Sequence, residues 1–370
     1  MKRTDPLYFP RSELAQRLLT SLKDGITHAL TLFAPRRMGK TQFLLNDIQP
    51  KAEDMGFNVF YFSFMDQAND SKIQQAFVYA LLDFLNDITQ GKSKLIDTLK
   101  NIKSLDILGV GVELNDKEEQ AQINLSRLLN EIAEKSEKPI LMLLDEVQEL
   151  ARSKGNDGLI RSLRTGLDVN QSKIKVIFTE SSTNGLKAMF NDNKAPFFHF
   201  AHALNFPHLD KAFTDFLADI YYQRTGKQLD KIAFYQAFER FHFTPLYMRA
   251  IAQDMIINPD LTLDEAIKYR LSQMEEQGGI ASQWQRLSEI ERQLLKLIAN
   301  GNGTPYSRET RLMLADVIGI EDLTASTIQG KIKKLERNEL ITRNIDKTLQ
   351  INNPHFKTWI KEMDSLEPIK

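Results

Sequence analysis

The sequence contains no cysteine, which excludes disulfides, thiolate metal sites and cysteine nucleophiles and fits a reducing compartment. It also has no apolar run close to the roughly 18 residues that cross a bilayer, and its first residues lack the apolar core of a signal peptide. An excess of charge is missing as well, because 48 Lys and Arg face 49 Asp and Glu, a net charge of −1. These absences predict a cytoplasmic protein without a membrane partner, in which any surface for nucleic acid must be local.

The 370 residues suffice for two or three domains, and the apolar pattern predicts three. Strands alternate with helices over about residues 25–206, which is typical of an α/β domain with a largely parallel sheet. Beyond Pro207 the strand signals stop, and residues 209–275 read as about four helices. The predicted domains are an α/β core over residues 1–207, a helical domain over residues 208–278 and a third domain over residues 279–370.

The elements of the core are predicted from the spacing of its apolar residues. The predicted strands are Ile26–Phe33, Phe57–Phe64, Pro139–Leu144 and Ile174–Phe178. The predicted helices are residues 13–23, 39–48, 73–88 and 118–134. Residues 105–114 are expected to form a small hairpin or an insertion.

The third domain has the order of elements of a winged helix-turn-helix. Its predicted helices are residues 288–299, 310–317 and 324–338, and its predicted strands are residues 340–343 and 348–352. The third helix carries four basic residues against one acidic residue over 324–337, and such a helix can enter the major groove of duplex DNA. The four are Lys331, Lys333, Lys334 and Arg337. Residues 284–370 as a whole hold 14 Lys and Arg against 12 Asp and Glu, so a protein-binding role stays open beside DNA binding.

Residues 34–41 (APRRMGKT) match the phosphate-binding loop pattern G-x-x-x-x-G-K-[ST], except that Ala34 stands at the first glycine. The loop follows a predicted strand and opens a predicted helix, so its N–H groups can hold a phosphate. Lys40 would reach the β- and γ-phosphates, and the Thr41 hydroxyl would bind Mg²⁺. The alternative is a basic turn in an unrelated α/β protein. The predicted nucleotide-binding residues of the loop are Pro35, Arg36, Arg37, Met38, Gly39, Lys40, Thr41 and Gln42.

A second signal is the pair Asp145-Glu146, which ends the apolar strand 139–144. The carboxyl edge of a parallel sheet is where ligands of open α/β folds bind. Asp145 would hold Mg²⁺, and Glu146 would activate the attacking water. One strand–helix pair lies between the phosphate loop and this pair in the sequence.

A third signal is Thr179-Glu180-Ser181-Ser182, which follows the strand 174–178. A hydroxyl there can lie near the γ-phosphate and the attacking water, and Ser181 is the predicted catalytic donor. An ordinary helix cap made by the same hydroxyl residues is the alternative.

With these motifs the sequence resembles the AAA+/STAND-like P-loop ATPases of archaeal and bacterial type, which are related to origin-recognition ATPases. The segment 32–41 (LFAPRRMGKT) matches the loop of one bacterial group, in which alanine at position 34 is normal. The segment 144–148 (LDEVQ) matches its Asp-Glu-x-Gln. The segment 178–181 (FTES) is similar to its sensor strand Phe-Thr-Gly-Ser, from which Glu180 departs. The segment 193–198 (NKAPFF) matches as well, and the likeness covers most of residues 1–260.

The resemblance implies an ASCE/AAA+ ATPase core, a helical lid over residues 208–278 and a winged helix. In the lid, Pro245 would lie against the adenine, and Arg249 with Ser181 would sense the γ-phosphate. The alternative is a proline at a helix start and a solvated arginine. Lys194 and Arg164 are candidates for a cation that acts on a neighbouring subunit, or they are ordinary surface charges.

The sequence therefore predicts a Mg²⁺-dependent ATP hydrolase with ATP and Mg²⁺ as its ligands. It would act as a nucleotide-driven switch or motor on DNA through the winged helix, with a homo-oligomer or a protein partner as further expectations. The alternative function is a nucleotide-gated signalling or defence module that binds a protein partner and hydrolyses ATP slowly or not at all.

Overall fold

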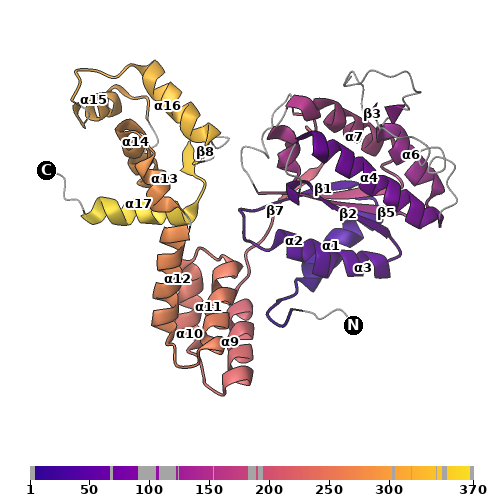
Figure 1. Ribbon diagram of the computed structural model, residues 1–370, viewed down its shortest axis with the longest axis horizontal. Coiled ribbons are helices and arrows are strands. Elements are labelled where there is room, and N and C mark those ends of the chain that lie inside the picture. Colours follow the sequence, from indigo (N-terminus) through magenta and orange to yellow (C-terminus); the bar gives the residue numbers. More distant parts are fainter. Residues whose placement is uncertain are drawn as a thin grey trace. The chain divides into compact units, whose positions relative to one another are not determined.

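The computed structural model describes residues 5–66, 70–90, 106–107, 122–123, 125–152, 154–181, 189–190, 195–277, 279–301, 305–317, 319–338, 340–343 and 348–366. The chain divides into two compact units, and both are drawn in Figure 1. The first unit is Pro10–Pro207. The second unit joins Met1–Phe9 to His208–Lys370, so the N-terminal segment packs with the C-terminal part of the chain.

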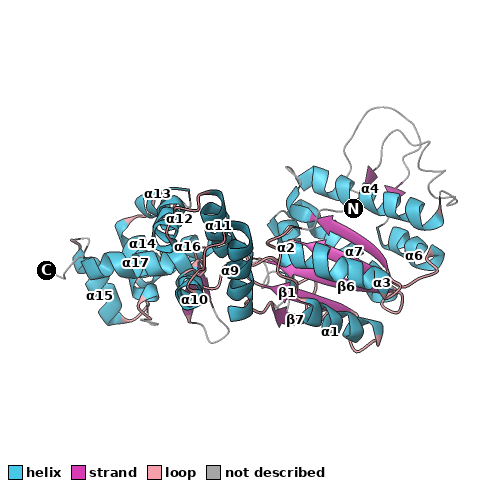
Figure 2. Ribbon diagram, turned by 90° about the horizontal axis from the view of Figure 1, so that it is seen from below, coloured by secondary structure: helices cyan, strands magenta, loops and turns pink. Residues whose placement is uncertain are grey.

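The first unit is built on a parallel sheet of five strands in the order β2-β5-β6-β1-β7. The strands are β1 (Ala29–Phe33), β2 (Asn58–Ser63), β5 (Ile140–Asp145), β6 (Ile174–Glu180) and β7 (His202–Asn205), and they appear as neighbouring magenta arrows in Figure 2. The register pairs Ser63 with Asp145, and Phe33 with Glu180. The carboxyl ends of β1, β2, β5 and β6 therefore meet at one edge of the sheet.

Helices cover both faces of this sheet (Figure 1). One face carries α1 (Ser12–Lys23), α2 (Lys40–Phe43), a π-helical turn (Leu44–Ile48) and α3 (Gln49–Asp54). The other face carries α4 (Asp70–Thr89), α6 (Leu125–Lys135) and α7 (Asp157–Val169). Alternation along β5 produces the two layers, because Leu141 and Leu143 join the first core while Met142 and Leu144 join the second.

Short segments complete the first unit. They are 3₁₀ turns at Phe64–Asp66, Val147–Arg152 and Lys154–Asn156, and the two-residue strands β3 (Asp106–Ile107) and β4 (Gln122–Ile123), which pair in parallel.

The structure confirms the four predicted core strands and corrects several limits. The predicted strand from Ile26 begins at Ala29, because Ile26 is exposed and precedes the paired residues. The predicted helix 118–134 is wrong at its start, since residues 122–123 pair with β3 and α6 begins at Leu125. Of the predicted hairpin 105–114, only residues 106–107 are described. They pair outside that range, and the rest lies outside the described residues. Strand β7 was not predicted.

Over its described residues, the second unit is helical apart from one strand pair. Its helices are α9 (Lys211–Thr225), α10 (Lys231–Arg240), α11 (Pro245–Ile257), α12 (Leu263–Gln277), α13 (Ile280–Gln285), α14 (Glu289–Ala299), α15 (Arg308–Val317), α16 (Ala325–Arg337) and α17 (Pro354–Leu366). Its antiparallel strands are β8 (Ile341–Arg343) and β9 (Leu349–Ile351). Asp210 and Asp230 cap the N-termini of α9 and α10 through their carboxylates. Among the described helices, none has both the length and the apolar character that a membrane span requires.

Two apolar cores hold the second unit together. The first is formed by α9–α12 and includes Leu7 from the N-terminal segment. The Phe9 ring of this segment forms T-shaped pairs with the rings of Phe213 and Phe216. The second is formed by residues of α13–α17 and the strand pair. The order α14-α15-α16-β8-β9 is the one expected for a winged helix, with α13 and α17 added. The winged-helix assignment and the division at residues 278 and 279 stay predictions.

Candidate active site

The loop between β1 and α2 has the backbone of a phosphate-binding loop. Gly39 immediately precedes α2 with a φ of 87°. A Cβ there would meet no atom within 4 Å, so the left-handed backbone, not space, favours glycine. Ala34 is not among the described residues with positive φ, and it is buried. Alanine adopts such a backbone without strain, so it can stand at the first glycine of the pattern.

Lys40 folds back onto this loop and is 4% exposed. Its Nζ donates to the carbonyl oxygens of Ala34 at 2.7 Å and Pro35 at 3.2 Å, and it lies 4.0 Å from Oε1 of Glu146. Burial lowers the pKa of Lys40, and the nearby carboxylates of the site, Glu146 foremost, counteract this effect. A desolvated cation therefore lies beside the loop, and a cation in such a setting favours an anionic ligand.

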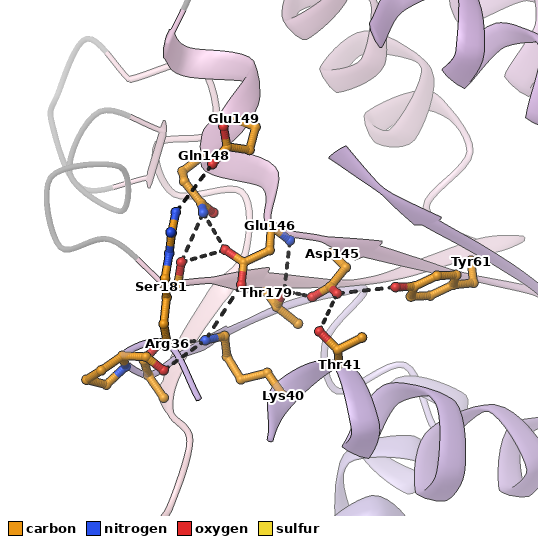
Figure 3. Close-up of polar contacts among 12 residues, drawn as sticks. Arg36, Lys40, Thr41, Tyr61, Asp145, Glu146, Gln148, Glu149, Thr179 and Ser181 are labelled. Atoms are coloured by element: carbon orange, nitrogen blue, oxygen red, sulfur yellow. Dashed lines mark hydrogen bonds and ion pairs between the residues drawn. The ribbon is translucent and has the colours of Figure 1, made fainter. Parts of the chain in front are cut away.

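Asp145 ends β5 and accepts hydrogen bonds from hydroxyl groups of three different elements (Figure 3). Thr41 of α2 donates to Oδ2 at 2.6 Å, and Tyr61 of β2 donates to the same oxygen at 3.3 Å. Thr179 of β6 donates to Oδ1. The parallel register of β2, β5 and β6 brings these groups to one edge. A carboxylate beside a threonine hydroxyl is a pair of oxygen ligands of the kind that Mg²⁺ prefers.

Glu146 follows Asp145 with a left-handed backbone, φ of 55°. Its N–H donates to Oγ1 of Thr179 at 3.0 Å, so Thr179 contacts both acidic residues. Its Oε2 accepts hydrogen bonds from Ser181 at 2.5 Å and from the amide of Gln148, while Oε1 is the oxygen near Lys40. Non-glycine residues rarely adopt positive φ, and when they do they cluster at functional sites.

The other predicted loop residues differ in their surroundings. Arg36 is half-exposed and lies 3.9 Å from a carboxylate oxygen of Glu149, a contact visible in Figure 3. The side chain of Met38 is buried in the core that the sheet shares with helices α1–α3, so only the backbone of Met38 could contact a ligand. The side chains of Pro35, Arg37 and Gln42 are exposed.

Glu180 continues β6, where the resembling family has glycine. Its backbone carbonyl accepts a hydrogen bond from the N–H of Ala34 at 3.3 Å, and its side chain is fully buried. The departure from glycine therefore leaves the strand intact and adds a third carboxylate to the surroundings of Lys40.

The predicted lid residues lie in the second unit. Pro245 is the first residue of α11, where its fixed φ and missing N–H suit a helix start. Arg249 of the same helix forms an ion pair with Asp5 of the N-terminal segment. Arg249 is therefore held within its own unit, and its approach to a nucleotide stays a prediction.

The sequence offers Arg164 and Lys194 as cations that could act on a neighbouring subunit, and the structure describes the first of them. Arg164 donates to the carbonyl oxygens of Pro196 at 2.6 Å and Phe198 at 3.2 Å, and it pairs with Asp168 at 3.1 Å. Arg164 thus fastens α7 to the segment before β7. Lys194 lies outside the described residues.

Two of the four basic residues of helix α16 form ion pairs with a residue of helix α14. Lys334 and Lys331 lie 2.9 Å and 3.4 Å from the same oxygen of Glu291, which is fully buried on α14. Burial alone would raise the pKa of Glu291, but the hydrogen bonds from Lys334 and Ser288 and the charge of Lys331 lower it to about 2. Lys333 and Arg337 are exposed.

Two residues of the site were not predicted, Tyr61 and Gln148. Tyr61 precedes by two residues the position that pairs with Asp145, so it shares a side of β2 with that position. A hydroxyl near the end of an apolar strand is the signal that could have found it, but the sequence does not state which strand lies beside β5. Gln148 is the last residue of the Asp-Glu-x-Gln motif, and the motif alone assigns it no role.

A family described as an ATPase domain predominantly from Archaea matches residues 8–238. No curated protein matches the sequence. Among solved structures, a Walker-type ATPase of Pyrococcus abyssi has a TM-score of 0.62 at 18% identity, covering 96% of this chain and 96% of that chain.

The ORC2 protein of Aeropyrum pernix is also similar. Its ADP form has a TM-score of 0.55 at 15% identity and covers 98% of this chain and 96% of that chain. Its ADPNP–ADP complexes give a TM-score of 0.51 at 15% identity, with 98% of each chain covered. At such identities the likeness shows a shared fold.

Proposed function

The chain belongs to the ATPase family described as predominantly archaeal, whose match covers residues 8–238, and we propose on this basis that it is a Mg²⁺-dependent ATPase that works as a nucleotide-driven switch. It is a P-loop ATPase with the α/β core that its solved neighbours share. The observation that carries the proposal is the pair of contacts from the loop to the acidic residues. Thr41 reaches Asp145 at 2.6 Å, and Lys40 lies 4.0 Å from Glu146.

The residues of the loop fit a triphosphate. In the proposed reaction, Lys40 exchanges the carbonyl oxygens of Ala34 and Pro35 for phosphate oxygens, and the N–H groups around Gly39 bind the β-phosphate. Thr41 and Asp145 would hold Mg²⁺, since their oxygens already lie within hydrogen-bond distance of each other. Bound Mg²⁺ supplies charge neutralisation of the β- and γ-phosphate oxygens.

Glu146 is the proposed general base. It is 8% exposed and faces Lys40 through Oε1, so a water bound there would be shielded from bulk solvent. Ser181 donates its one hydroxyl proton to the other oxygen at 2.5 Å, so donation to the γ-phosphate, as the sequence predicts, would require this hydrogen bond to break. For Pro245 and Arg249 of the second unit, the roles toward the adenine and the γ-phosphate that the resemblance implies stay predictions.

The nucleotide recovered from the protein tests this function. Glu146→Gln keeps the size of the side chain and removes the base, so the variant should retain ATP, whereas the wild type should end with ADP. Glu53→Gln on the exposed side of α3 is the matched control and should behave as the wild type. Recovery of ADP from Glu146→Gln at the wild-type rate would contradict the role of Glu146.

We further propose that duplex DNA contacts α16 through Lys333 and Arg337. These side chains are exposed and four residues apart, so they share one side of the helix. Lys331 and Lys334 already pair with Glu291 and have less charge to offer. In a band-shift titration against salt, Lys333→Ala with Arg337→Ala should lower the salt slope by about 2, and an unchanged slope would count against this surface.

A second candidate partner is a protein, and exposed apolar side chains on α15 and just after it favour it. Leu312, Met313, Val317 and Ile320 are each 43–47% exposed, and such residues are common in protein interfaces. Salt-insensitive or absent DNA binding together with a stable protein complex in one nucleotide state would favour this candidate. Absence of a complex in both states would exclude it.

A further inference from the structure

Gln148 is a buried amide that contacts the proposed base and has no role in the function proposed above. It is 3% exposed and lies in the 3₁₀ turn Val147–Arg152. Its Nε2 donates to Oε2 of Glu146 and, at 3.1 Å, to Oγ of Ser181. Ser181 in turn donates to the same Oε2 at 2.5 Å. The three side chains therefore form a closed ring of hydrogen bonds, which Figure 3 shows.

The contacts divide the two oxygens of Glu146 between different partners. Oε2 receives both donors of the ring, whereas Oε1 lies 4.0 Å from Nζ of Lys40. Lys40 is the residue proposed to bind the phosphate oxygens, so its Nζ lies on the side of the site where the phosphates would bind. The ring therefore turns Oε1 toward the place where a phosphate and its attacking water would lie.

The Gln148 amide is oriented so that its N–H groups are hydrogen-bonded while, over the part of the chain that the structure describes, its carbonyl oxygen is not. The carbonyl oxygen of Gln148 is buried and accepts no hydrogen bond from the described residues. An amide placed for packing alone would be expected to satisfy its oxygen as well. Here both contacts come from its N–H groups, and both go to the ring.

The backbone also needs an external constraint. Glu146 has a φ of 55°, which a non-glycine residue holds only when its surroundings fix it. The turn that carries Gln148 is itself anchored, because Asn156 donates to the carbonyl of Leu150 at 3.2 Å and Gln74 donates to Asn156 at 3.1 Å. A rigid support thus reaches Glu146 through Gln148.

We propose that Gln148 is a positioning residue for ATP hydrolysis: with Ser181 it fixes Oε2 of Glu146, so that Oε1 is the oxygen that takes the proton. In this step water gives a proton to Oε1 and its oxygen bonds to the γ-phosphorus. The bond from that phosphorus to the bridging oxygen breaks, and ADP leaves with the electron pair. The inference rests on the proposed function, and Gln148 acts through Glu146 without touching the substrate.

The test is single-turnover hydrolysis of ATP with Mg²⁺ by the full chain, together with the dissociation constant for ADP. Gln148→Met fills the buried volume without a donor, and Gln148→Ala is the second variant. Gln49→Met is the matched control, because it removes a partly buried glutamine of the same unit that donates a hydrogen bond to Glu53 on α3, outside the site. Each change is made in the wild type and in Glu146→Gln.

The expected result is a single-turnover rate lower by about 10- to 100-fold in Gln148→Met, with the ADP dissociation constant within about twofold of the wild type. In Glu146→Gln the same change should alter the residual rate less than about twofold, since residues that act as a unit are not additive.

Equal losses in both backgrounds, or a wild-type rate in Gln148→Met, would overturn the inference while leaving the ATPase intact. A wild type that binds ADP but never hydrolyses ATP would contradict the proposed function itself, and the role of Gln148 with it.

Discussion

Thr179 shows how single residues organise the site. Its hydroxyl donates to Asp145 and accepts from the N–H of Glu146, so one side chain of β6 aligns the proposed metal ligand with the proposed base. The sequence placed Asp145, Glu146 and Thr179 at strand ends, and the structure brings them together. The contacts of Tyr61 and Gln148 could not be predicted from the sequence. The first depends on which strand lies beside β5, and the second depends on how the turn after Glu146 folds.

The buried charge of Lys40 should affect both the stability of the protein and the binding of ADP. Its pKa is lowered by burial, so at neutral pH the charged form is less favourable in the folded chain than in the unfolded chain. Lys40→Met should therefore leave the melting temperature of the nucleotide-free protein unchanged or higher. The same variant should lose the rise in melting temperature that ADP with Mg²⁺ gives the wild type.

Thermal unfolding with and without ADP measures both effects. A variant that melts lower without ADP, yet is still stabilised by ADP, would contradict the role given to Lys40.

At the scale of elements, most helices and strands were predictable because their apolar periods are regular. Helices α9–α12 and the order from α14 to β9 follow the predicted pattern. Strand β7 was missed because its burial is low and its sequence has two polar residues among four. Helix α6 was predicted too early, since pairing with β3 removes residues 122–123 from it.

The contact between α6 and α7 depends on Gly166. A Cβ at this position would lie 2.6 Å from Cδ1 of Leu129 and 3.0 Å from Cα of Ser126. Gly166→Ala should therefore lower the free energy of unfolding by about 1–3 kcal/mol, measured by chemical denaturation. Gly158→Ala in the same helix meets no atom within 4 Å and should be neutral or stabilising. Equal effects of the two changes would refute this packing.

The contact between α14 and α16 depends on Glu291. Because the pKa of Glu291 is lowered to about 2, its charged form stabilises the folded state above about pH 4.5, and this contribution is lost as the pH falls toward 2. Both lysines are partly exposed, so we expect about 1–2 kcal/mol at neutral pH. Glu291→Gln should melt below the wild type at pH 7, and the difference should shrink below pH 4.5. A difference that grows on acidification would contradict the ion pairs.

At the scale of the whole molecule, the sequence predicted an ATPase core followed by helical and winged parts. It did not predict that residues 1–9 join the second unit, where Asp5 pairs with Arg249. Local periodicity cannot indicate such a pairing, because the two residues are far apart in the chain. Charge counting along α16 likewise could not indicate that Lys331 and Lys334 pair with Glu291, since this partner lies on another helix.

The most direct measurement is the rate of ATP turnover with Mg²⁺, for the wild type and for Glu146→Gln, over a range of protein concentrations. The wild type should turn over ATP, and Glu146→Gln should be slower by about 10²- to 10⁴-fold at saturating ATP. A turnover rate per chain that rises with protein concentration would mean that the active form of the ATPase is an assembly of chains. Equal turnover by the two proteins would contradict the claim that Glu146, held beside Lys40, is the base of this ATPase.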